Sequence, residues 1–234
     1  MKHQYFGDIN DYRKYGILRT LSECRLTITV CWMLTENDGR SDGRNISYLD
    51  EEEKFLRCDP KLFNALHDAV IKKNCRNVRE IQTRRLIPKA RYMNDLVPDS
   101  IVGRKSYFAK LLRVARGSDL IFFDPDNGIE VKSKPKGKKD SNKYVYWDEV
   151  ENFWRNGYSL LMYQHFPRVN RNKYIKVIKR GIMSRTGSKD IVAFKTSSVA
   201  FFLLIQGKHR RLIHRAVESL RERWNACEQK CKVI

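Results

Sequence analysis

The sequence lacks the features of a membrane-inserted or exported chain. None of its 234 residues lies in an apolar run of the length, about eighteen residues or more, that a membrane-spanning helix needs. The opening stretch, MKHQYFGDINDYRKYG, contains no apolar segment of the kind found in a signal peptide. We therefore expect a cytoplasmic protein with no membrane partner.

Cysteine pairs at metal-binding spacing are also missing. The six cysteines are spread along the chain without a Cys-x-x-Cys pair or a neighbouring His-x-x-x-His. This spacing argues against a structural zinc site and against a disulfide framework. We expect the thiols to be reduced and mostly buried.

Negative charge is scarce relative to positive charge. The chain has 47 Lys and Arg against 27 Asp and Glu, a formal net charge of +20. Such a field attracts polyanions, so DNA or RNA is the first partner to consider. The loop KSKPKGKKDSNK (132–143) and the strand end at 165–168 carry the candidate substrate-binding residues, which are Lys136, Lys138, Lys139 and Arg168. The alternative for the loop is a flexible, solvated segment without a ligand.

Strand-like and helix-like segments alternate along the chain, and 41% of the residues are hydrophobic. Residues 25–34, 119–123, 158–163, 190–195 and 199–206 are typical of strands, and helical patterns lie between most of them. This predicts one α/β domain over residues 1–234, with a mostly parallel sheet between two helical layers. Residues 45–95 look like a mainly helical insert. Only two serines and a threonine separate the last two strands, which predicts a terminal hairpin.

The segment DLIFFDPDNGIEV (119–131) places Asp-Pro-Asp-Asn-Gly directly after a buried strand. Ligands of open parallel sheets bind beyond the carboxyl ends of the strands. The loops that follow residues 34, 123 and 163 should open on this same edge. The alternative is that Asp-Pro-Asp-Asn-Gly is only a turn, because these residue types favour tight turns by themselves.

The stretch FGDINDYRKYGIL (6–18) resembles the N-terminal motif of the ribosomal RNA adenine-N6 methyltransferases related to the J-type enzyme of the large subunit. That family's motif, Gly-Asn-x-x-Asp-x-x-Lys-His, aligns with Gly7, Asp8, Asp11, Lys14 and Tyr15. A later strand in that family ends in Asp-Pro-Pro-Tyr, and here the corresponding stretch is DPDNG. The resemblance implies a Rossmann-like, class I methyltransferase fold that uses S-adenosylmethionine.

The resemblance also implies roles for particular residues. The segment 7–15 and the loop 35–43 would hold the cofactor, and the candidates are Gly7, Asp8, Asp11, Lys14, Asp38 and Gly39. The turn after residue 123 would hold the target base, with Asp124, Asp126 and Asn127 as catalytic candidates. Asp126 and Asn127 stand where the family has proline and tyrosine, so the stacking ring is absent.

His165 follows the next strand, in LLMYQHFPR, and is the fourth catalytic candidate. An imidazole there could act as a general base, or could bind phosphate together with Arg168. The alternative is a histidine that only makes a structural hydrogen bond.

Two other functions remain open at this stage. Asp124, Asp126 and Glu130, with Asp38 or Asp42, could provide oxygen ligands for magnesium in a nuclease or phosphotransferase, for example one used in antiviral defence. A non-catalytic nucleic-acid-binding protein would keep the fold and the positive charge without a cofactor. The sequence thus predicts a nucleic-acid-directed enzyme, most simply a divergent methyltransferase.

Overall fold

The computed structural model describes residues 1–40, 43–226 and 231–234, and its centre is a seven-stranded sheet. The strands of this sheet are β1 (Ile28–Cys31), β2 (Arg91–Met93), β3 (Leu120–Phe123), β6 (Ser159–His165), β7 (Ile191–Lys195), β8 (Val199–Leu204) and β9 (Lys232–Val233). The short strands β4 (Gly128–Ile129) and β5 (Tyr144–Val145) form a separate parallel pair. The helices are α1 (Ile9–Glu23), α2 (Glu52–Phe55), α3 (Pro60–His67), α4 (Arg79–Thr83), α5 (Ile101–Val114), α6 (Trp147–Arg155), α7 (Arg171–Thr186) and α8 (Arg210–Ala226).

The order of strands in the sheet is β2-β1-β3-β6-β8-β7-β9. Strands β2, β1, β3 and β6 are mutually parallel, whereas β8 runs antiparallel to both of its neighbours, β6 and β7. The predicted mostly parallel α/β sheet and the terminal β7–β8 hairpin are therefore confirmed. The arrangement is compatible with a Rossmann-like fold.

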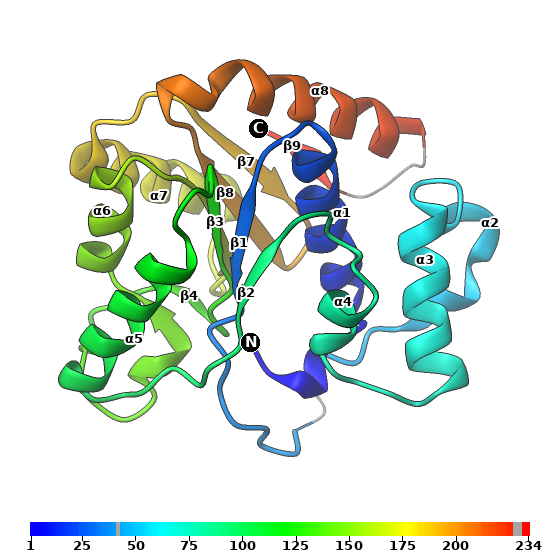
Figure 1. The fold of residues 1–234 in the computed structure, drawn as a ribbon, viewed down its shortest axis with the longest axis horizontal. Coiled ribbons are helices and arrows are strands. Elements are labelled where there is room, and N and C mark those ends of the chain that lie inside the picture. The colour runs from blue at the N-terminus through cyan, green and yellow to red at the C-terminus, as the bar shows by residue number, and fades with distance from the viewer. Residues whose placement is uncertain (41–42, 227–230) are drawn as a thin grey trace.

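Helices cover both faces of the sheet (Figure 1). One apolar core packs α1 and α8 against the sheet, with α3 on the outer side of α1, and the other packs α5, α6 and α7 against the opposite face. Successive residues of β3 alternate between the two cores, with Leu120 and Phe122 on one side and Ile121 and Phe123 on the other. This explains why β3 reads as one uninterrupted apolar run.

Helix α1 is buried around almost its whole circumference. Its N-cap is Asp8, whose carboxylate accepts a hydrogen bond from the backbone N–H of Asn10. Every residue from 11 to 22 is buried, because the helices between β1 and β2 cover the side of α1 that the sheet leaves open. The Tyr12 ring, for example, packs against Tyr48 and Phe55 of that segment. The polar side chains of α1 therefore need buried partners.

One expectation from the sequence is wrong in detail. The cysteines are not all reduced, because Cys58 is disulfide-bonded, whereas Cys24, Cys31, Cys75 and Cys231 are free thiols. The loop 132–143 connects β4 to β5 and includes a short 3₁₀-helix, Ser141–Lys143.

A buried ion pair fastens the helical segment 47–83 to α1. Arg19 Nε lies 2.6 Å from Asp59 Oδ2, and its Nη2 donates to Asp59 Oδ1 at 3.2 Å. Asp59 also caps α3 by accepting from the backbone N–H of Leu62. One carboxylate thus starts a helix and neutralises a buried guanidinium.

We expect Asp59→Asn to lower the free energy of unfolding by about 3 kcal/mol, because buried Arg19 would lose its close counter-charge and keep only the exposed Glu23, 3.5 Å away. Asparagine still caps helices, so this variant isolates the loss of charge. The matched control is Glu51→Gln, which alters an exposed pair with Lys54 and should cost less than about 1 kcal/mol. Urea denaturation measures both, and equal effects would contradict the assignment.

Candidate functional site

A cavity of about 580 Å³ opens at the carboxyl ends of β3 and β6. Four chain segments that are distant in sequence meet there: the N-terminal segment with the start of α1, the loop around Asn45, the turn after β3, and the β6 end with the β7–β8 turn. The lining residues are Met1, Tyr5, Asp8, Ile9, Asn10, Asp11, Arg13, Lys14, Gly43, Asn45, Asp124, Pro125, Asp126, Asn127, Tyr163, His165, Ser197, Ser198 and Val199. The Asp-Pro-Asp-Asn-Gly turn therefore lies at a cavity.

Lys14 joins two of these segments through buried ion pairs. Its Nζ lies 2.8 Å from Asp11 Oδ1 and 2.6 Å from Asp124 Oδ2, and the three side chains are between 2% and 6% exposed. Burial alone would lower the pKa of Lys14, but the two carboxylates raise it above its usual value, so the ammonium stays charged. One ammonium faces two carboxyls, and burial raises the pKa of both Asp11 and Asp124.

The turn after β3 is held in place by Gln164. Its amide donates to the carbonyl of Asn127 at 3.2 Å and accepts from the backbone N–H of Ile129 at 2.9 Å. Gly128 adopts φ +119°, and a Cβ at this position would collide with the Gln164 side chain. Only glycine suits this close approach, which sets the direction of the turn. Asn127 and His165 consequently line the same cavity.

Asp126 points inward and is already paired. It is 4% exposed, accepts from the Thr35 hydroxyl at 2.7 Å, and pairs with the amino nitrogen of Met1 and with Lys2. Burial would raise the pKa of Asp126, but the Met1 amine, Thr35 and Lys2 outweigh it and lower that pKa. Asp126 therefore binds the N-terminal segment and the loop after β1 to the turn.

The structure places only some of the candidate cofactor residues at the cavity. Asp8, Asp11 and Lys14 line the cavity, whereas Gly7, Asp38 and Gly39 are absent from its described lining. Gly7 donates its backbone N–H to Asp11, and Asp38 pairs with Lys2, whose hydrogen bond lowers the pKa of Asp38. Asp42 lies outside the described residues.

The alternative magnesium ligands are not gathered at one point. Glu130 accepts a hydrogen bond from the backbone N–H of Trp147 at the start of α6, while Asp124 and Asp126 face different cations. Within residues 1–40, 43–226 and 231–234, no group of three or more His, Cys, Asp or Glu side chains is placed to hold a metal ion. The geometry gives the metal alternative no support.

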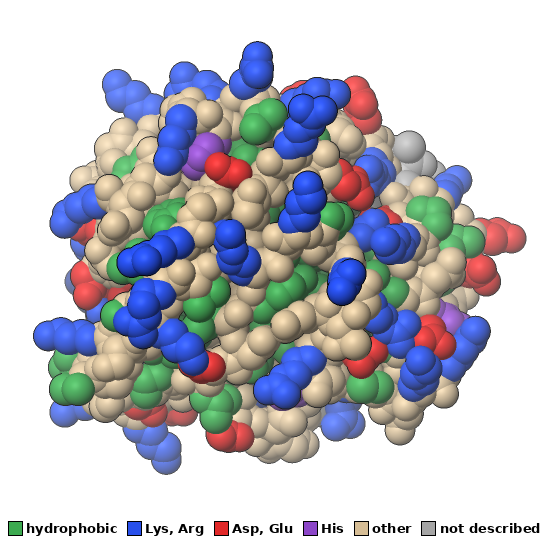
Figure 2. Space-filling view, viewed as in Figure 1, with side chains coloured by type: hydrophobic (Ala, Val, Ile, Leu, Met, Phe, Trp, Pro, Cys, Tyr) green, Lys and Arg blue, Asp and Glu red, His purple; other side chains and the backbone are tan. Residues whose placement is uncertain are grey.

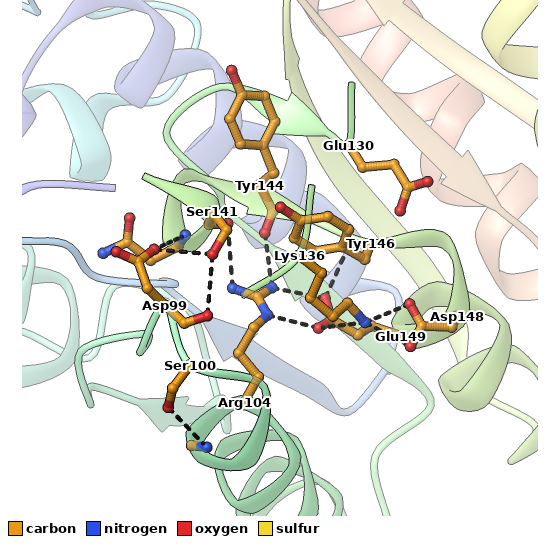
Figure 3. A network of polar contacts seen from close by, with 12 residues as sticks. Asp99, Ser100, Arg104, Glu130, Lys136, Ser141, Tyr144, Tyr146, Asp148 and Glu149 are labelled. Carbon is orange, nitrogen blue, oxygen red and sulfur yellow. Dashed lines mark hydrogen bonds and ion pairs between the residues drawn. The ribbon is translucent and has the colours of Figure 1, made fainter. Parts of the chain in front are cut away.

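The lysine-rich loop is anchored by a buried network (Figure 3). Arg104 of α5 is 1% exposed, pairs with Glu149, and donates to the carbonyls of Ser141 and Tyr144. Lys136 lies 2.5 Å from Asp148 and 3.2 Å from Glu149. Lys136 is therefore already paired within the protein.

The other candidate phosphate-binding residues are exposed. Lys138 and Lys139 lie on the surface of the loop. Arg168 lines a second hollow of about 530 Å³, together with His165, Phe166, Pro167, Val169, Asn170, Arg171, Ser197 and Ser198. His165, Ser197 and Ser198 belong to both hollows, which are therefore adjacent. Figure 2 shows Lys and Arg side chains spread over the whole visible face, with acidic side chains between them.

Sequence reasoning did not single out four of the cavity's polar residues. Arg13 and Asn10 come from the first turns of α1, and Ser197 and Ser198 come from the β7–β8 turn. The hairpin prediction placed the two serines between strands, but nothing in the sequence showed that this turn faces α1. A basic residue inside a helical pattern gives no sign that it is buried.

The comparisons with known proteins identify no relative. No protein-family model and no curated protein matches the chain. None of the described helices has both the length and the apolar character required to cross a membrane. The predicted function and partners are therefore proposals that rest on the resemblance, the net charge and the geometry of the site.

The pairing of Asp126 predicts a specific dependence of stability on pH. Because its folded-state pKa lies below the ordinary 3.8, its contribution is present above that pH and is lost as the pH falls through the folded value. We expect Asp126→Asn to cost roughly 1–3 kcal/mol near neutral pH, and the deficit to shrink below pH 3.8. Urea denaturation of the wild-type and Asp126→Asn proteins, from neutral pH to below pH 3.8, measures this deficit in unfolding free energy. A deficit that stays constant with pH would contradict the pairing.

The network around Arg104 gives a second stability prediction. We expect Arg104→Met to lower the free energy of unfolding by roughly 3–5 kcal/mol, because Glu149 and two carbonyl groups lose a buried partner. The control is Arg155→Met, whose exposed pair with Glu151 should contribute less than about 1 kcal/mol. Limited proteolysis should also cut the loop 132–143 faster in Arg104→Met. An uncut loop would show that other contacts hold it.

Proposed function

We propose that the protein is a nucleic-acid-directed enzyme, a divergent S-adenosylmethionine-dependent methyltransferase. One observation carries the proposal: the segment 7–15, which resembles the family's N-terminal motif, and the turn 124–127, which stands where the family binds its target base, contribute to one cavity. The two segments are joined directly by the Lys14 to Asp124 ion pair. A resemblance that rests on two stretches more than a hundred residues apart gains support when the stretches meet.

The sheet supports the same proposal. The methyltransferase class is expected to end its parallel sheet in a strand hairpin, and here β8 runs antiparallel between β6 and β7. The cavity also lies at the carboxyl ends of the parallel strands, where open α/β sheets bind their ligands. Fold alone does not give function, so the argument depends on the cavity and its residues.

The cavity has the size and the polar groups that a nucleoside cofactor needs. Its volume of about 580 Å³ falls within the range of about 300–1,000 Å³ that is usual for small-molecule sites. Asp8 and Asn45 on its wall offer hydrogen-bond acceptors and donors to a ribose and a base. These residues, together with Asp11 and Lys14, are the ones that would hold S-adenosylmethionine. When bound there, it supplies an activated methyl group.

The chain's own residues have separate roles in this proposal. Lys14 pairs with the Asp124 carboxylate, so Asp124 fixes the position of the turn. Asn127, beside it, presents a side-chain amide that can both donate to and accept from a base edge. Methylation of an amino nitrogen releases a proton, and the imidazole of His165 on the same wall is a group that can accept it.

Nucleic acid as the substrate is supported by charge and by shape. The net charge of +20 favours encounter with a polyanion. The second hollow, which contains Arg168 and Arg171, adjoins the cavity through His165 and the β7–β8 turn. A strand could therefore follow the second hollow while one base enters the cavity. Lys138 and Lys139 remain available to more distant phosphates.

The test measures cofactor binding and methyl transfer separately. Calorimetry should detect S-adenosylmethionine binding to the wild-type protein in the absence of magnesium. Transfer of labelled methyl groups to DNA or RNA should fall by about 10²-fold in Asn127→Ala and His165→Ala, with cofactor affinity retained. The control is His214→Ala, an exposed histidine of α8 that pairs with Asp190.

Three results would contradict the proposal, and the first two each indicate a different function. Magnesium-dependent cleavage without cofactor binding would favour the nuclease alternative. Nucleic-acid binding with neither cofactor nor metal would favour a non-catalytic binding protein. Absence of nucleic-acid binding even at low salt would remove the premise of all three functions.

A further inference from the structure

Arg13 is a buried cation without a carboxylate partner. It is 8% exposed, and among the residues that the structure describes no acidic group lies within ion-pair distance of it. Its Nη1 donates to Asn10 Oδ1 at 3.2 Å, while its Nε is buried without a hydrogen-bond partner. The other buried basic side chains of α1, Lys14 and Arg19, both pair with carboxylates. Arg13 is the exception on this helix.

An unpaired buried guanidinium is energetically unfavourable. Burial lowers the pKa of Arg13, yet a guanidinium retains its proton at neutral pH. Cys231 and Asp8 act in the opposite direction and raise that pKa, but the Asp8 carboxylate is engaged elsewhere, since it accepts from the backbone N–H groups of Asn10 and Asn45. Buried charges in proteins are normally paired, so an anion from outside the chain is the partner that the site lacks.

Arg13 lies on the wall of the cavity beside other donors. Asn10, which accepts from Arg13, donates its own Nδ2 to Ser198 Oγ at 3.3 Å. Ser198 Oγ accepts that bond, so its hydroxyl hydrogen remains available to a ligand. Ser197 is exposed next to it, and all four residues line the cavity. The start of α1 and the β7–β8 turn thus form one cationic, hydroxyl-containing corner.

We propose that this corner, formed by Arg13, Asn10 and Ser198, binds one phosphate group of the nucleic-acid strand whose base enters the cavity. The inference rests on the proposed function and names the part of the substrate that positions the base. Arginine suits phosphate because its planar fork donates two parallel hydrogen bonds to the oxygens. A phosphodiester is favoured over an isolated carboxylate because Ser197 and Ser198 also belong to the second hollow, which Arg168 and Arg171 extend.

The experiment removes the charge of Arg13 and the charge of a single phosphate linkage separately. A short single-stranded oligonucleotide is compared with a series in which one linkage at a time is an uncharged methylphosphonate. For the wild-type protein, one linkage should weaken binding by about tenfold when neutralised. Arg13→Gln should weaken binding of the unmodified strand by a similar factor, and neutralising that linkage should then cause no further loss of affinity. The slope of log affinity against log salt concentration should fall in magnitude by about one.

Two further variants exclude trivial explanations. Arg211→Gln removes an exposed charge from α8 outside both hollows and should retain the linkage-specific loss. Arg13→Lys should recover part of the affinity, since it keeps the charge but not the fork. Thermal unfolding checks that Arg13→Gln is folded, which we expect because no carboxylate loses its partner.

The outcomes separate this inference from the proposed function. If S-adenosylmethionine does not bind but the linkage-specific loss depends on Arg13, the proposed function fails and the phosphate subsite stands. If Arg13→Gln abolishes cofactor binding and leaves the oligonucleotide series unchanged, the anion is the cofactor's carboxylate and the phosphate proposal is overturned. An Arg13→Gln protein with wild-type affinity and linkage dependence overturns it as well.

Discussion

The buried ammonium of Lys14 is the contact on which the arrangement of the site depends. It lies between a carboxylate of its own helix, Asp11, and a carboxylate at the end of a central strand, Asp124. Because a charge that has left water needs its partners at close range, this contact fixes the start of α1 against the exit of β3. The cavity exists where these two elements meet, and its floor is formed by the ion-paired cluster.

Asp126 and Asp38 are also ion-paired within the protein, and Asp8 accepts hydrogen bonds from two backbone N–H groups. Asp126, one of the metal-ligand candidates of the sequence, instead fastens the N-terminal segment to the turn through Lys2 and the loop after β1 through Thr35. Asp38 does the same for the loop after β1. Cations of the chain itself therefore neutralise the turn. Among the described side chains of α1, Arg13 is the charged group on the cavity wall that has no ion-pair partner. An edge with paired acids and one free guanidinium is suited to an anionic ligand more than to a divalent cation.

The helices between β1 and β2 explain why a polar helix is so deeply buried. They cover the side of α1 that faces away from the sheet, so its tyrosines, lysine and arginines all lie inside the protein. Arg19 is matched by Asp59 from this same segment. Specific polar contacts therefore add to the apolar packing that holds α1, which makes the helix a rigid support for the residues at its N-terminal end.

The sequence by itself determined the secondary-structure elements and the edge of the sheet at which a ligand would bind. Period-two and helical patterns are local, so the β3 run, the hairpin and helices such as α5 could be read directly, and the rule for parallel sheets placed the turn after Phe123 at the ligand edge. It also identified Asp124 from its place after a buried strand and, through the resemblance alone, Lys14. Only the tertiary structure decided which charged side chains pair with one another. Whether Asp126 binds a metal or an amine, whether Lys136 is free, and whether Arg13 has a partner depend on side chains distant in sequence, because pairing in a buried site is set by contact distance and burial.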